Sequence, residues 1–350
     1  MRILVTGGAG YLGSVLVPKL LARGHHVRIV DMGYFGLGHM RSLRGSVELI
    51  REDICRAATD PRFAGQILDG CDSVIHLAAI SNDPSAELNP ELTERVNFSA
   101  TVALAEAARH KGLRFVFSSS CSVYGEAEGE IDESGFVNPL TTYAVTKVQA
   151  ERVLGEMADG TWSPVILRNG TLFGYSPRMR FDLVINIFSL YSTLHNEIKV
   201  FGEGGQWRPY LHVNDCARAL AFFAEKRDLH HLCYNVAGDN LRVTDVADIF
   251  RTLNPHLKVT HLEMQDVDRR DYRVSMRRLH EEGFSPRTGV VAGTEALIEA
   301  IVAGLIQDPE AVFYRNAKWL KELSHIGNKD HLQVMTLLES MSQSGSPFRS

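Results

Sequence analysis

The sequence predicts an α/β fold with a doubly wound parallel sheet and a smaller C-terminal lobe. Short apolar runs alternate with amphipathic segments of helical spacing through the first half of the chain. A glycine-rich turn joins the first apolar run to the first helical segment. After about residue 170 the alternation stops, and glycine- and proline-rich turns separate short elements. These observations predict one large sheet domain followed by a lobe of mixed structure.

Five apolar runs predict the strands. Each is short and partly β-branched, which is typical of a parallel sheet covered on both faces. The runs are residues 2–5, 27–30, 73–77, 115–118 and 165–167, and the helical segments between them are residues 11–23, 91–111 and 143–157. Such sheets bind ligands beyond the carboxyl ends of their strands, so the functional residues are expected there.

The chain divides into three expected parts. Residues 1–170 form the sheet domain, to which later segments return, and residues 171–305 form mainly a substrate-binding lobe. Residues 306–350 form a helical extension, with apolar spacing over 313–323 and 332–341 and a disordered end in SQSGSPFRS.

The composition is ordinary for a soluble globular protein, with 45% hydrophobic and 23% charged residues. The net charge of −5 provides no basic field that would attract nucleic acid or an anionic membrane. The 5 cysteines are far apart and form no CxxC, which favours reduced thiols over disulfides or a zinc site, so no metal is expected. The N-terminus lacks the features of a secretory signal, and no apolar stretch approaches about 18 residues. We therefore expect a cytoplasmic protein.

The first candidate site is the turn Thr6-Gly-Gly-Ala-Gly-Tyr-Leu-Gly13. Gly7, Gly10 and Gly13 form a GxxGxxG spacing between a strand and a helix. Glycine is needed where a chain turns sharply, where backbone approaches a pyrophosphate and where a helix packs on a strand. The helix N-terminus also presents N–H groups and a positive dipole end to phosphates. A glycine trio alone is weak evidence, but this strand–turn–helix context predicts a dinucleotide site.

The second strand distinguishes between the two nicotinamide dinucleotides. It ends at Asp31, 18 residues after Gly13. A carboxylate there can accept hydrogen bonds from the ribose hydroxyls of NAD and would repel the 2′-phosphate of NADP. We therefore expect NAD, although an aspartate at this position can also simply open a turn.

Two further stretches fit the same site. Asp53-Ile54 lies in an expected loop where an adenine can be held. His76-Leu-Ala-Ala79 ends a strand with small residues, which suits backbone running beneath a cofactor. His76 itself is expected to be a packed structural histidine rather than a base.

Tyr143-Ala-Val-Thr-Lys147 is the centre of the catalytic prediction. Positions i and i+4 share one face of a helix, so the ammonium lies near the phenol. A cation about 4 Å away at an effective dielectric near 20 contributes about 4 kcal/mol, or about three pKa units. The positive nicotinamide adds to this, so we expect the pKa of Tyr143 to approach neutrality, where a general base works best. Taken alone, the same spacing also occurs in surface helix pairs.

Serines end the strand that precedes this helix. In Ser118-Ser-Ser-Cys-Ser-Val-Tyr-Gly125, a hydroxyl can donate to a substrate oxygen while accepting from the phenol. The order of glycine turn, ribose carboxylate, strand-end serines and Y-x-x-x-K is much more specific than any one of these pieces.

The segments TGGAGYLG, HLAA, SSSCSVYG, YAVTK and RPYLHVND resemble, in this order, the extended short-chain dehydrogenase/reductases of the NAD-dependent nucleotide-sugar epimerase/dehydratase family. The resemblance covers about residues 1–305. It implies a Rossmann-type NAD-binding domain, a substrate-binding lobe and a homodimer formed through the helices that carry Asn97 and Tyr143. It also implies that Ser120, Tyr143 and Lys147 are catalytic. The residues expected at the NAD site, including the supporting asparagine Asn97, are Gly7, Gly10, Tyr11, Leu12, Gly13, Asp31, Asp53, Ile54, Leu77, Ala78, Ala79, Asn97, Ser118, Tyr143 and Lys147.

Two departures from the family pattern carry information. Nucleotide-sugar 4,6-dehydratases have Asp-Glu where this chain has Cys121-Ser122, so the resemblance argues against water elimination. Arg168-Asn-Gly-Thr-Leu-Phe-Gly174 stands where many members have Arg-Pro-x-Asn-x-Tyr-Gly. Thr171 therefore replaces the usual asparagine, which changes the expected contact with the substrate.

The resemblance also indicates a nucleotide-diphosphate substrate. Arg208 occupies the position of the family arginine that contacts a diphosphate, and a guanidinium can bind two oxygens at once. Arg270 lies in the basic run 268–273 and is a second candidate, unless that run is a solvated loop. The basic stretch Ser176-Pro-Arg-Met-Arg180 lies near the same mouth without an assigned role. The expected substrate contacts are Ser120, Ser122, Thr171, Asn186, Arg208 and Arg270.

Together these observations predict an NAD-dependent epimerase of a nucleotide-diphosphate sugar, acting at C4 through a transient 4-keto sugar. Tyr143 removes the hydroxyl proton, Ser120 bonds the reacting oxygen, and Lys147 holds the nicotinamide ribose. A ketoreductase or dehydrogenase of the same fold is an alternative, as is epimerisation at C3 or C5, for which Cys121-Ser122 offers the nearby groups. A non-catalytic NAD-sensing protein is a third alternative, although such proteins usually lose the tyrosine or the lysine.

Overall fold

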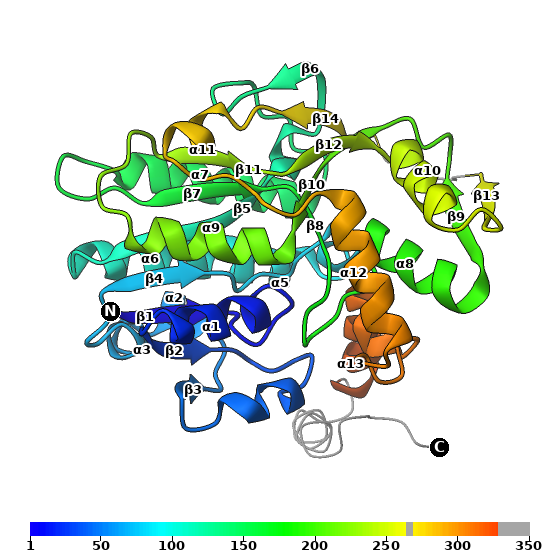
Figure 1. Ribbon diagram of the computed structural model, residues 1–350. Helices are drawn as coiled ribbons and strands as arrows, with labels where there is room; N and C mark the ends of the chain where they lie inside the picture. Colours follow the sequence, from blue (N-terminus) through cyan, green and yellow to red (C-terminus); the bar gives the residue numbers. More distant parts are fainter. Residues whose placement is uncertain (264–268, 328–350) are drawn as a thin grey trace.

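The structure is a computed structural model that describes residues 1–263 and 269–327. Seven parallel strands form one sheet in the order β11-β7-β5-β4-β1-β2-β3 (Figure 1). Their bounds are β1 (Arg2–Thr6), β2 (His26–Val30), β3 (Val47–Ile50), β4 (Ser73–His76), β5 (Arg114–Ser120), β7 (Val165–Asn169) and β11 (Cys233–Val236). All five predicted strands lie in this sheet. The strand order reverses between β1 and β4, which is where a doubly wound sheet opens its binding crevice.

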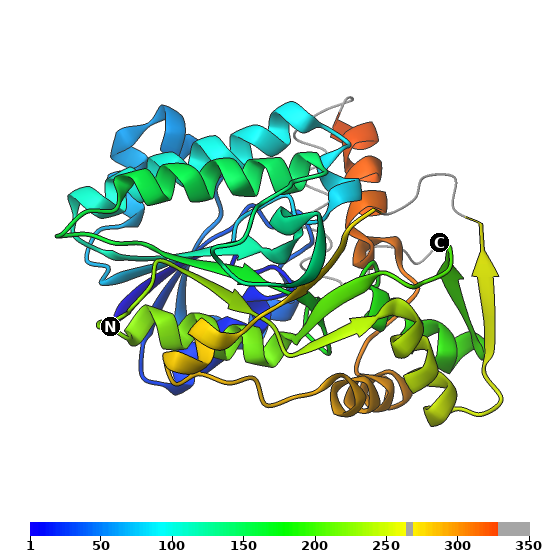
Figure 2. The same cartoon turned by 90° about the horizontal axis from the view of Figure 1, so that it is seen from above.

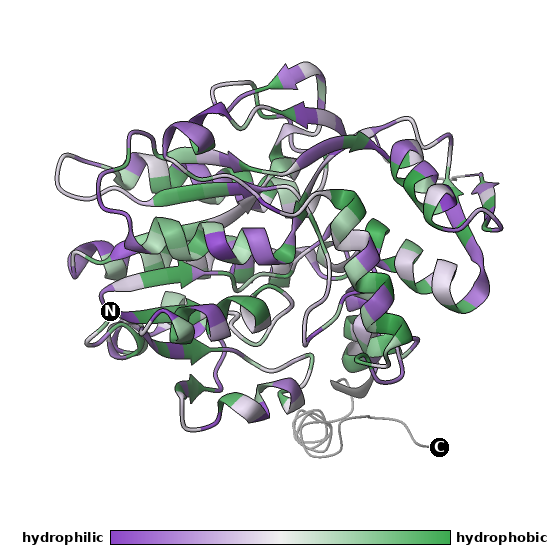
Figure 3. Ribbon diagram, in the orientation of Figure 1, coloured by the Kyte–Doolittle hydropathy of each residue, from purple (hydrophilic) through white to green (hydrophobic). Residues whose placement is uncertain are grey.

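Helices cover both faces of the sheet (Figure 2). One face packs against α1 (Gly13–Ala22) and α9 (Val213–Glu225), and the other packs against α3 (Pro61–Ile67), α6 (Ala100–His110) and α7 (Thr142–Met157). The central strands are apolar because both of their faces are covered, as the hydropathy colouring of Figure 3 shows. Each fully buried aliphatic side chain in this core contributes about 1.5–3 kcal/mol of transfer free energy.

The predicted helix over 91–111 is divided into three pieces. It begins as α5 (Pro90–Glu94), widens into a π-helical turn η2 (Arg95–Ser99), and continues as α6. Asn97 lies in the widened turn, where its Oδ1 accepts from Ile80 N at 2.8 Å and its Nδ2 donates to Ile80 O at 3.1 Å. The π turn therefore turns a helix residue toward the loop after β4, a change that helical periodicity does not predict.

The C-terminal lobe is built from short strands and three main helices. Strands β8 (Thr171–Phe173), β10 (Trp207–His212) and β12 (Asp239–Arg242) form one small sheet. Two further pairs join β9 (Glu197–Phe201) to β13 (Lys258–Leu262) and β6 (Glu126–Ile131) to β14 (Asp271–Val274). The helices are α8 (Val184–His195), α10 (Val243–Leu253) and α12 (Val290–Val302). Strand β11 and helix α9 belong to the large domain, whereas the expected domain bounds stay a prediction.

The remaining elements are short. They are η1 (Gly38–Leu43), α2 (Arg56–Thr59), α4 (Asp83–Ala86), η3 (Cys121–Tyr124) and α11 (Arg277–Glu281). None of the helices in the described ranges combines the length and apolar character needed to cross a membrane. Helices α6 and α7, through which we expect a dimer, lie side by side; the dimer and the cytoplasmic location stay predictions.

The chain ends its described part in η4 (Val312–Tyr314) and α13 (Asn316–Gly327), where a helix is predicted over 313–323. Trp319 is fully buried, packs against Tyr34 and Phe35, and its Nε1 donates to Tyr34 O at 2.6 Å. The extension therefore folds back onto the loop after β2 (Figure 1). The second predicted helix, 332–341, and the end expected to be disordered lie outside the described residues.

Candidate active site

The turn between β1 and α1 leaves no room for side chains at the predicted glycines. Gly7 has a φ of +68°, and a Cβ there would lie 2.8 Å from Ala78 N. A Cβ on Gly13 would lie 2.5 Å from Gly8 O, and one on Gly10 would lie 3.2 Å from Gly7 O. The glycines therefore let the turn pack directly against the chain leaving β4 and bring the first turn of α1 to the pocket.

Asp31 ends β2 with both carboxylate oxygens held by backbone. Oδ2 accepts from Ala9 N at 2.9 Å, and Oδ1 accepts from Gly33 N at 2.8 Å. Burial raises the pKa of this carboxyl, and the two backbone hydrogen bonds oppose the rise. Each oxygen can still accept a further hydrogen bond, so the arrangement suits two ribose hydroxyls.

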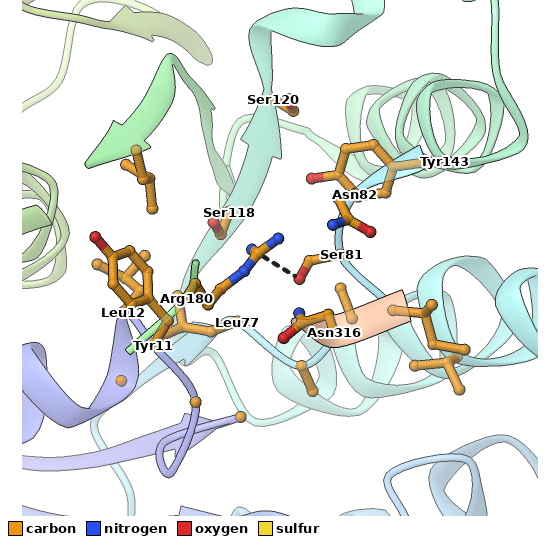
Figure 4. A pocket seen from close by; sticks show the side chains of 18 of the residues that line it. Tyr11, Leu12, Leu77, Ser81, Asn82, Ser118, Ser120, Tyr143, Arg180 and Asn316 are labelled. Carbon is orange, nitrogen blue, oxygen red and sulfur yellow. Dashed lines mark hydrogen bonds between the residues drawn. The ribbon is translucent and has the colours of Figure 1, made fainter. Parts of the chain in front are cut away.

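One pocket connects this carboxylate with the predicted catalytic residues (Figure 4). It runs along the carboxyl ends of β1, β2, β4, β5 and β7 and contains most of the predicted site. The predicted residues that line it are Gly7, Gly10, Tyr11, Leu12, Gly13, Asp31, Asp53, Ile54, Leu77, Ala78, Ala79, Ser118, Ser120, Ser122, Tyr143, Lys147, Thr171 and Arg270. The pocket thus combines the glycine turn, the anchored Asp31 carboxylate and the small residues Ala78 and Ala79. This combination fits an extended dinucleotide.

Tyr143 and Lys147 come from the first turns of α7. Thr141 caps this helix by accepting from Ala144 N at 3.2 Å, which sets where the helix begins. Lys147 is buried, and its Nζ donates to Ser118 O at 2.8 Å. The same ammonium lies 5.7 Å from the centre of the Tyr143 ring. Ser120, at the end of β5, lies on the far side of the phenol from the helix (Figure 4).

The pKa of Tyr143 differs from the sequence expectation. This pKa is raised to about 12, first by burial of the phenol and then by the nearby Asp83 carboxylate. Hydrogen bonding to Ser120 and the charges of two arginines, Arg180 and Arg270, lower it without reversing the shift. Without a ligand the phenol is therefore protonated at neutral pH. The expectation of a near-neutral pKa left out the cost of burying the phenolate.

Lys147 is itself sensitive to burial. Its pKa is lowered to about 7 because the ammonium is removed from water, and Glu151 opposes this shift. Glu151 pairs with Arg168 at 2.7 Å, so its charge is shared between two cations. A partly neutral lysine cannot depress the pKa of the phenol as a full charge would.

The pair at the end of β5 provides no strong acid. Burial raises the pKa of the Cys121 thiol well above its ordinary value, and its Sγ donates to Arg168 O at 3.1 Å. Ser122 lines the pocket, and its buried Oγ has no hydrogen-bond partner among the described residues. A hydroxyl facing a ligand can bind an oxygen but cannot replace a carboxylic acid.

Three predicted site residues lie behind the pocket wall instead of lining it. Asn97 is occupied by Ile80 and the helix α7 hydroxyl of Thr146. Asn186 is fully buried; its Nδ2 donates to the Tyr11 hydroxyl at 3.2 Å. These two asparagines position the residues that line the pocket.

Arg208 is the third. It is buried, and its Nη1 donates to Trp207 O at 2.8 Å and to Arg270 O. Arg208 therefore lies behind the lining of this pocket, and its direct contact with a diphosphate stays a prediction. Backbone carbonyls bind the guanidinium, which holds the Arg270 segment against the pocket.

Four pocket residues form ion pairs or hydrogen bonds across the site. Arg180 forms a two-pronged pair with Asp182, with Nε to Oδ1 at 3.0 Å, and its Nη1 donates to Ser81 at 3.3 Å (Figure 4). Arg270 pairs with Asp83, which also accepts from the Thr141 hydroxyl. Both arginines thus have a carboxylate partner, and Asp83, the partner of Arg270, also acts on the Tyr143 phenol.

The prediction left several lining residues unassigned. Arg178 and Arg180 come from the basic stretch noted in the sequence without a role, and Ser81-Asn82 follows the small residues after β4. Their clustering after strand ends is the signal that could have found them. Asn316 also lines the pocket. It lies far along the chain from Arg178 and Arg180 and belongs to no local motif, so no signal in the sequence points to it.

Comparison with known proteins gives a family match over most of the chain. The model of the NAD dependent epimerase/dehydratase family matches residues 3–237. An uncharacterized UDP-glucose epimerase of Bacillus subtilis, YtcB, is 31% identical over 252 residues, which are 68% of this chain and 77% of that protein. UDP-glucuronic acid decarboxylase 1 of Arabidopsis thaliana is 32% identical over 238 residues, which are 64% of this chain and 52% of that protein.

Among solved structures, MoeE5 in complex with UDP-glucose and NAD is similar at 33% identity. The match has a TM-score of 0.73 and covers 87% of this chain and all of MoeE5 (100%). The similar proteins thus bear the names of more than one reaction.

Proposed function

The chain belongs to the NAD-dependent epimerase/dehydratase family, with NAD as its cofactor, and we propose that it inverts C4 of a nucleotide-diphosphate sugar. One observation carries the proposal. The pocket offers one tyrosine base with its serine and lysine, and the carboxylate close to them among the described residues, Asp83, is already bound by Arg270 and Thr141. Oxidation and reduction at one carbon need a single proton-transfer group, whereas elimination or proton abstraction from C3 or C5 needs another.

The carboxylates of the pocket support this reading. Four of them line it: Asp31, Glu52, Asp53 and Asp83. Asp31 follows β2, and Glu52 and Asp53 follow β3, so these three lie at the far end of the sheet from α7. Asp83 is close to the phenol, but it is bound by Arg270 and by the Thr141 hydroxyl. Both oxygens of Asp83 are therefore already engaged, Oδ1 with Thr141 and Oδ2 with Arg270.

Each catalytic residue has a defined part in this proposal. Tyr143 Oη takes the proton of the C4 hydroxyl and later returns it to the same oxygen, while Ser120 Oγ holds that oxygen in place. Lys147 Nζ, fixed by Ser118 O, orients the ribose beside it. Bound NAD⁺ supplies the hydride acceptor for C4 and adds positive charge beside the phenol.

The similar proteins support a nucleotide-sugar substrate. YtcB is named as a UDP-glucose epimerase, and MoeE5 was solved with UDP-glucose and NAD. For the decarboxylase the chain spans about half the length of the relative, so that likeness supports the substrate class and not the reaction.

The test is the Tyr143→Phe variant with a panel of nucleotide-diphosphate sugars. Sugar nucleotides that raise the melting temperature of the wild type in the presence of NAD are incubated with it, and products are read by NMR together with NADH absorbance. We expect an epimer at C4 with no net NADH. The variant should lose about 10²–10⁴-fold in rate, the contribution of one acid–base group, while still binding NAD.

Tyr191→Phe is the matched control, because this tyrosine lies on α8 and does not line the pocket. Turnover of Tyr143→Phe close to that of the control would reject the assignment of the base. Net cofactor consumption by the wild type would instead indicate a ketoreductase or dehydrogenase.

A further inference from the structure

Arg178 is a buried cation in the wall of the NAD pocket. It is 2% exposed and lines the pocket, and its guanidinium lies 3.8 Å from the centre of the Phe35 ring. Its Nη2 donates to Asn316 Oδ1 at 2.6 Å. Neither Nε nor Nη1 has a hydrogen-bond partner in the part of the chain that the structure describes, and Nε is fully buried. A donor left without an acceptor in such surroundings is costly, so Nη1 is available to an acceptor that enters from the pocket.

No carboxylate in the described ranges forms an ion pair with Arg178. Asp31 and Asp182 attract it from a distance, but they are bound by backbone N–H groups and by Arg180, respectively. Burial lowers the pKa of Arg178 to about 9, which still leaves it charged at neutral pH. The guanidinium contacts an amide oxygen and an aromatic face, and two carboxylates act on it from a distance. None of these neutralises its charge. An anion in the pocket would do so in low-dielectric surroundings, where charge-assisted hydrogen bonds are strongest.

The position of Arg178 identifies the kind of anion. Ser176 Oγ donates to Tyr11 O at 2.7 Å, so the segment that carries Arg178 crosses over the glycine turn. On the other side, Asp31 marks the place of the adenosine ribose. A dinucleotide has its diphosphate between this ribose and the N-terminus of the first helix. The arginine therefore lies beside the part of the pocket that receives the diphosphate.

The C-terminal helix holds this arginine in place. Asn316 is the first residue of α13; it is buried, lines the pocket, and its backbone N donates to Asp182 Oδ2 at 3.3 Å. Further along the helix, Trp319 anchors α13 on Tyr34. These residues lie beyond the range 3–237 that the family match covers. The extension thus adds a wall to a cofactor site that the matched region otherwise supplies.

We propose that Arg178 binds the diphosphate of NAD and that α13 positions it through Asn316. The proposal rests on NAD as the cofactor and not on which carbon of the sugar reacts. It assigns the C-terminal extension a role in cofactor binding, so that affinity for the dinucleotide depends on a segment outside the matched region.

The first test compares ligands that contain or lack the diphosphate. Nucleotide-free wild type and Arg178→Gln, both full length, are titrated with NAD, ADP-ribose and adenosine by calorimetry. We expect Arg178→Gln to weaken NAD and ADP-ribose by about 10- to 100-fold, the effect of losing a hydrogen bond to a charged group. Adenosine, which has no phosphate, should bind both proteins equally.

A second variant keeps the arginine and changes its partner. Asn316→Asp is nearly isosteric and gives Arg178 a carboxylate that competes with the diphosphate, so it should weaken ADP-ribose while raising the melting temperature of the ligand-free protein. Lys318→Gln is the matched control, because it removes one charge from the exposed side of the same helix and should change neither property.

Several outcomes would overturn the proposal. Unchanged ADP-ribose affinity in both variants would leave Arg178 with a structural role. NADP and UDP are titrated in the same way: a loss confined to NADP would place the arginine at a 2′-phosphate, and a loss confined to UDP would place it at the substrate. If the wild type bound UDP-sugars but never formed the C4 epimer, the proposed function would fail while these titrations stayed interpretable.

Discussion

At the scale of single residues, two hydrogen bonds determine the tautomer of the buried His76. His76 Nε2 lies 2.9 Å from the Thr101 hydroxyl, which already donates to Asn97 O at 2.8 Å. Nε2 is therefore the donor, and Nδ1 accepts from the Thr6 hydroxyl at 2.7 Å. This neutral form agrees with burial lowering the pKa of His76 to about 3. The histidine supports the chain beneath the cofactor, in agreement with its expected structural role.

Lys147 shows the cost of a functional charge. Its pKa is about 7 in the folded protein against an ordinary value of 10.5, so the unfolded chain binds more protons between these values. Stability therefore rises with pH from about 7 to 10 on account of this residue. Lys147→Met removes that dependence. In ligand-free protein we expect the variant to melt above the wild type at pH 6, with the difference shrinking by pH 9.5, and to lose at least about 100-fold in turnover.

Lys111→Met is the control, because Lys111 is exposed and pairs weakly with Asp69 at 3.6 Å. Its melting temperature should follow that of the wild type across the same pH range. A Lys147→Met difference that stays constant with pH would show that the ammonium is not destabilised by burial.

At the scale of elements, the sequence predicted those features that depend on residues close together in the chain. The strand–turn–helix motif with Gly7, Gly10 and Gly13 could be recognised because the three glycines and their flanking elements lie within one short segment, and Gly10 and Gly13 are constrained by atoms of that segment. The same holds for the i, i+4 pair on α7. The π turn at Asn97 and the contribution of Asn316 could not be predicted, because both depend on packing between segments distant in sequence.

Two glycine-to-alanine substitutions, one in the turn and one in a helix, test the steric account of the turn. Gly7→Ala places a Cβ 2.8 Å from Ala78 N in a backbone conformation with φ of +68°, which should lower the free energy of unfolding by about 1–3 kcal/mol and weaken NAD binding. Gly65 lies in α3 with open space around it, so Gly65→Ala should raise the same free energy by about 0.5–1 kcal/mol. Urea unfolding of both variants checks the opposite signs. Equal effects would contradict the steric account of the turn.

At the scale of the whole molecule, charged side chains from both sides of the crevice interact across the pocket. Asp83 comes from α4 on the sheet domain, and Arg270 precedes β14, which pairs with β6. Arg180 and Asp182 form a second pair in front of Asn82, whose Nδ2 donates to Asp182 Oδ2 at 2.7 Å. Substrate binding therefore has to compete with the Arg270–Asp83 ion pair and the Asn82–Asp182 hydrogen bond, which already join the two sides. Asp83 also influences the base, so binding and proton transfer are coupled through it.

Asp83→Asn separates these two effects. Losing the carboxylate removes a negative charge that raises the pKa of Tyr143, so the phenolate becomes easier to form and the acidic limb of kcat/KM should move to lower pH. The variant also removes one ion pair of Arg270. Since a partly exposed pair contributes about 0.2–1 kcal/mol, KM for the nucleotide sugar should fall about two- to fivefold. Asparagine still accepts from Thr141, so the cap of α7 is preserved.

The measurement is a pH–rate profile of the epimerase reaction for wild type, Asp83→Asn and Asp248→Asn. Asp248 pairs with Arg251 at 2.6 Å on the exposed face of α10, so its variant removes an ion pair of the same type far from the pocket and should match the wild type. A lower KM with an unmoved acidic limb would show that Asp83 acts on the substrate arginine alone. A shifted limb with an unchanged KM would show that Arg270 does not bind the diphosphate. Both changes together are what a carboxylate shared between the base and the binding arginine requires.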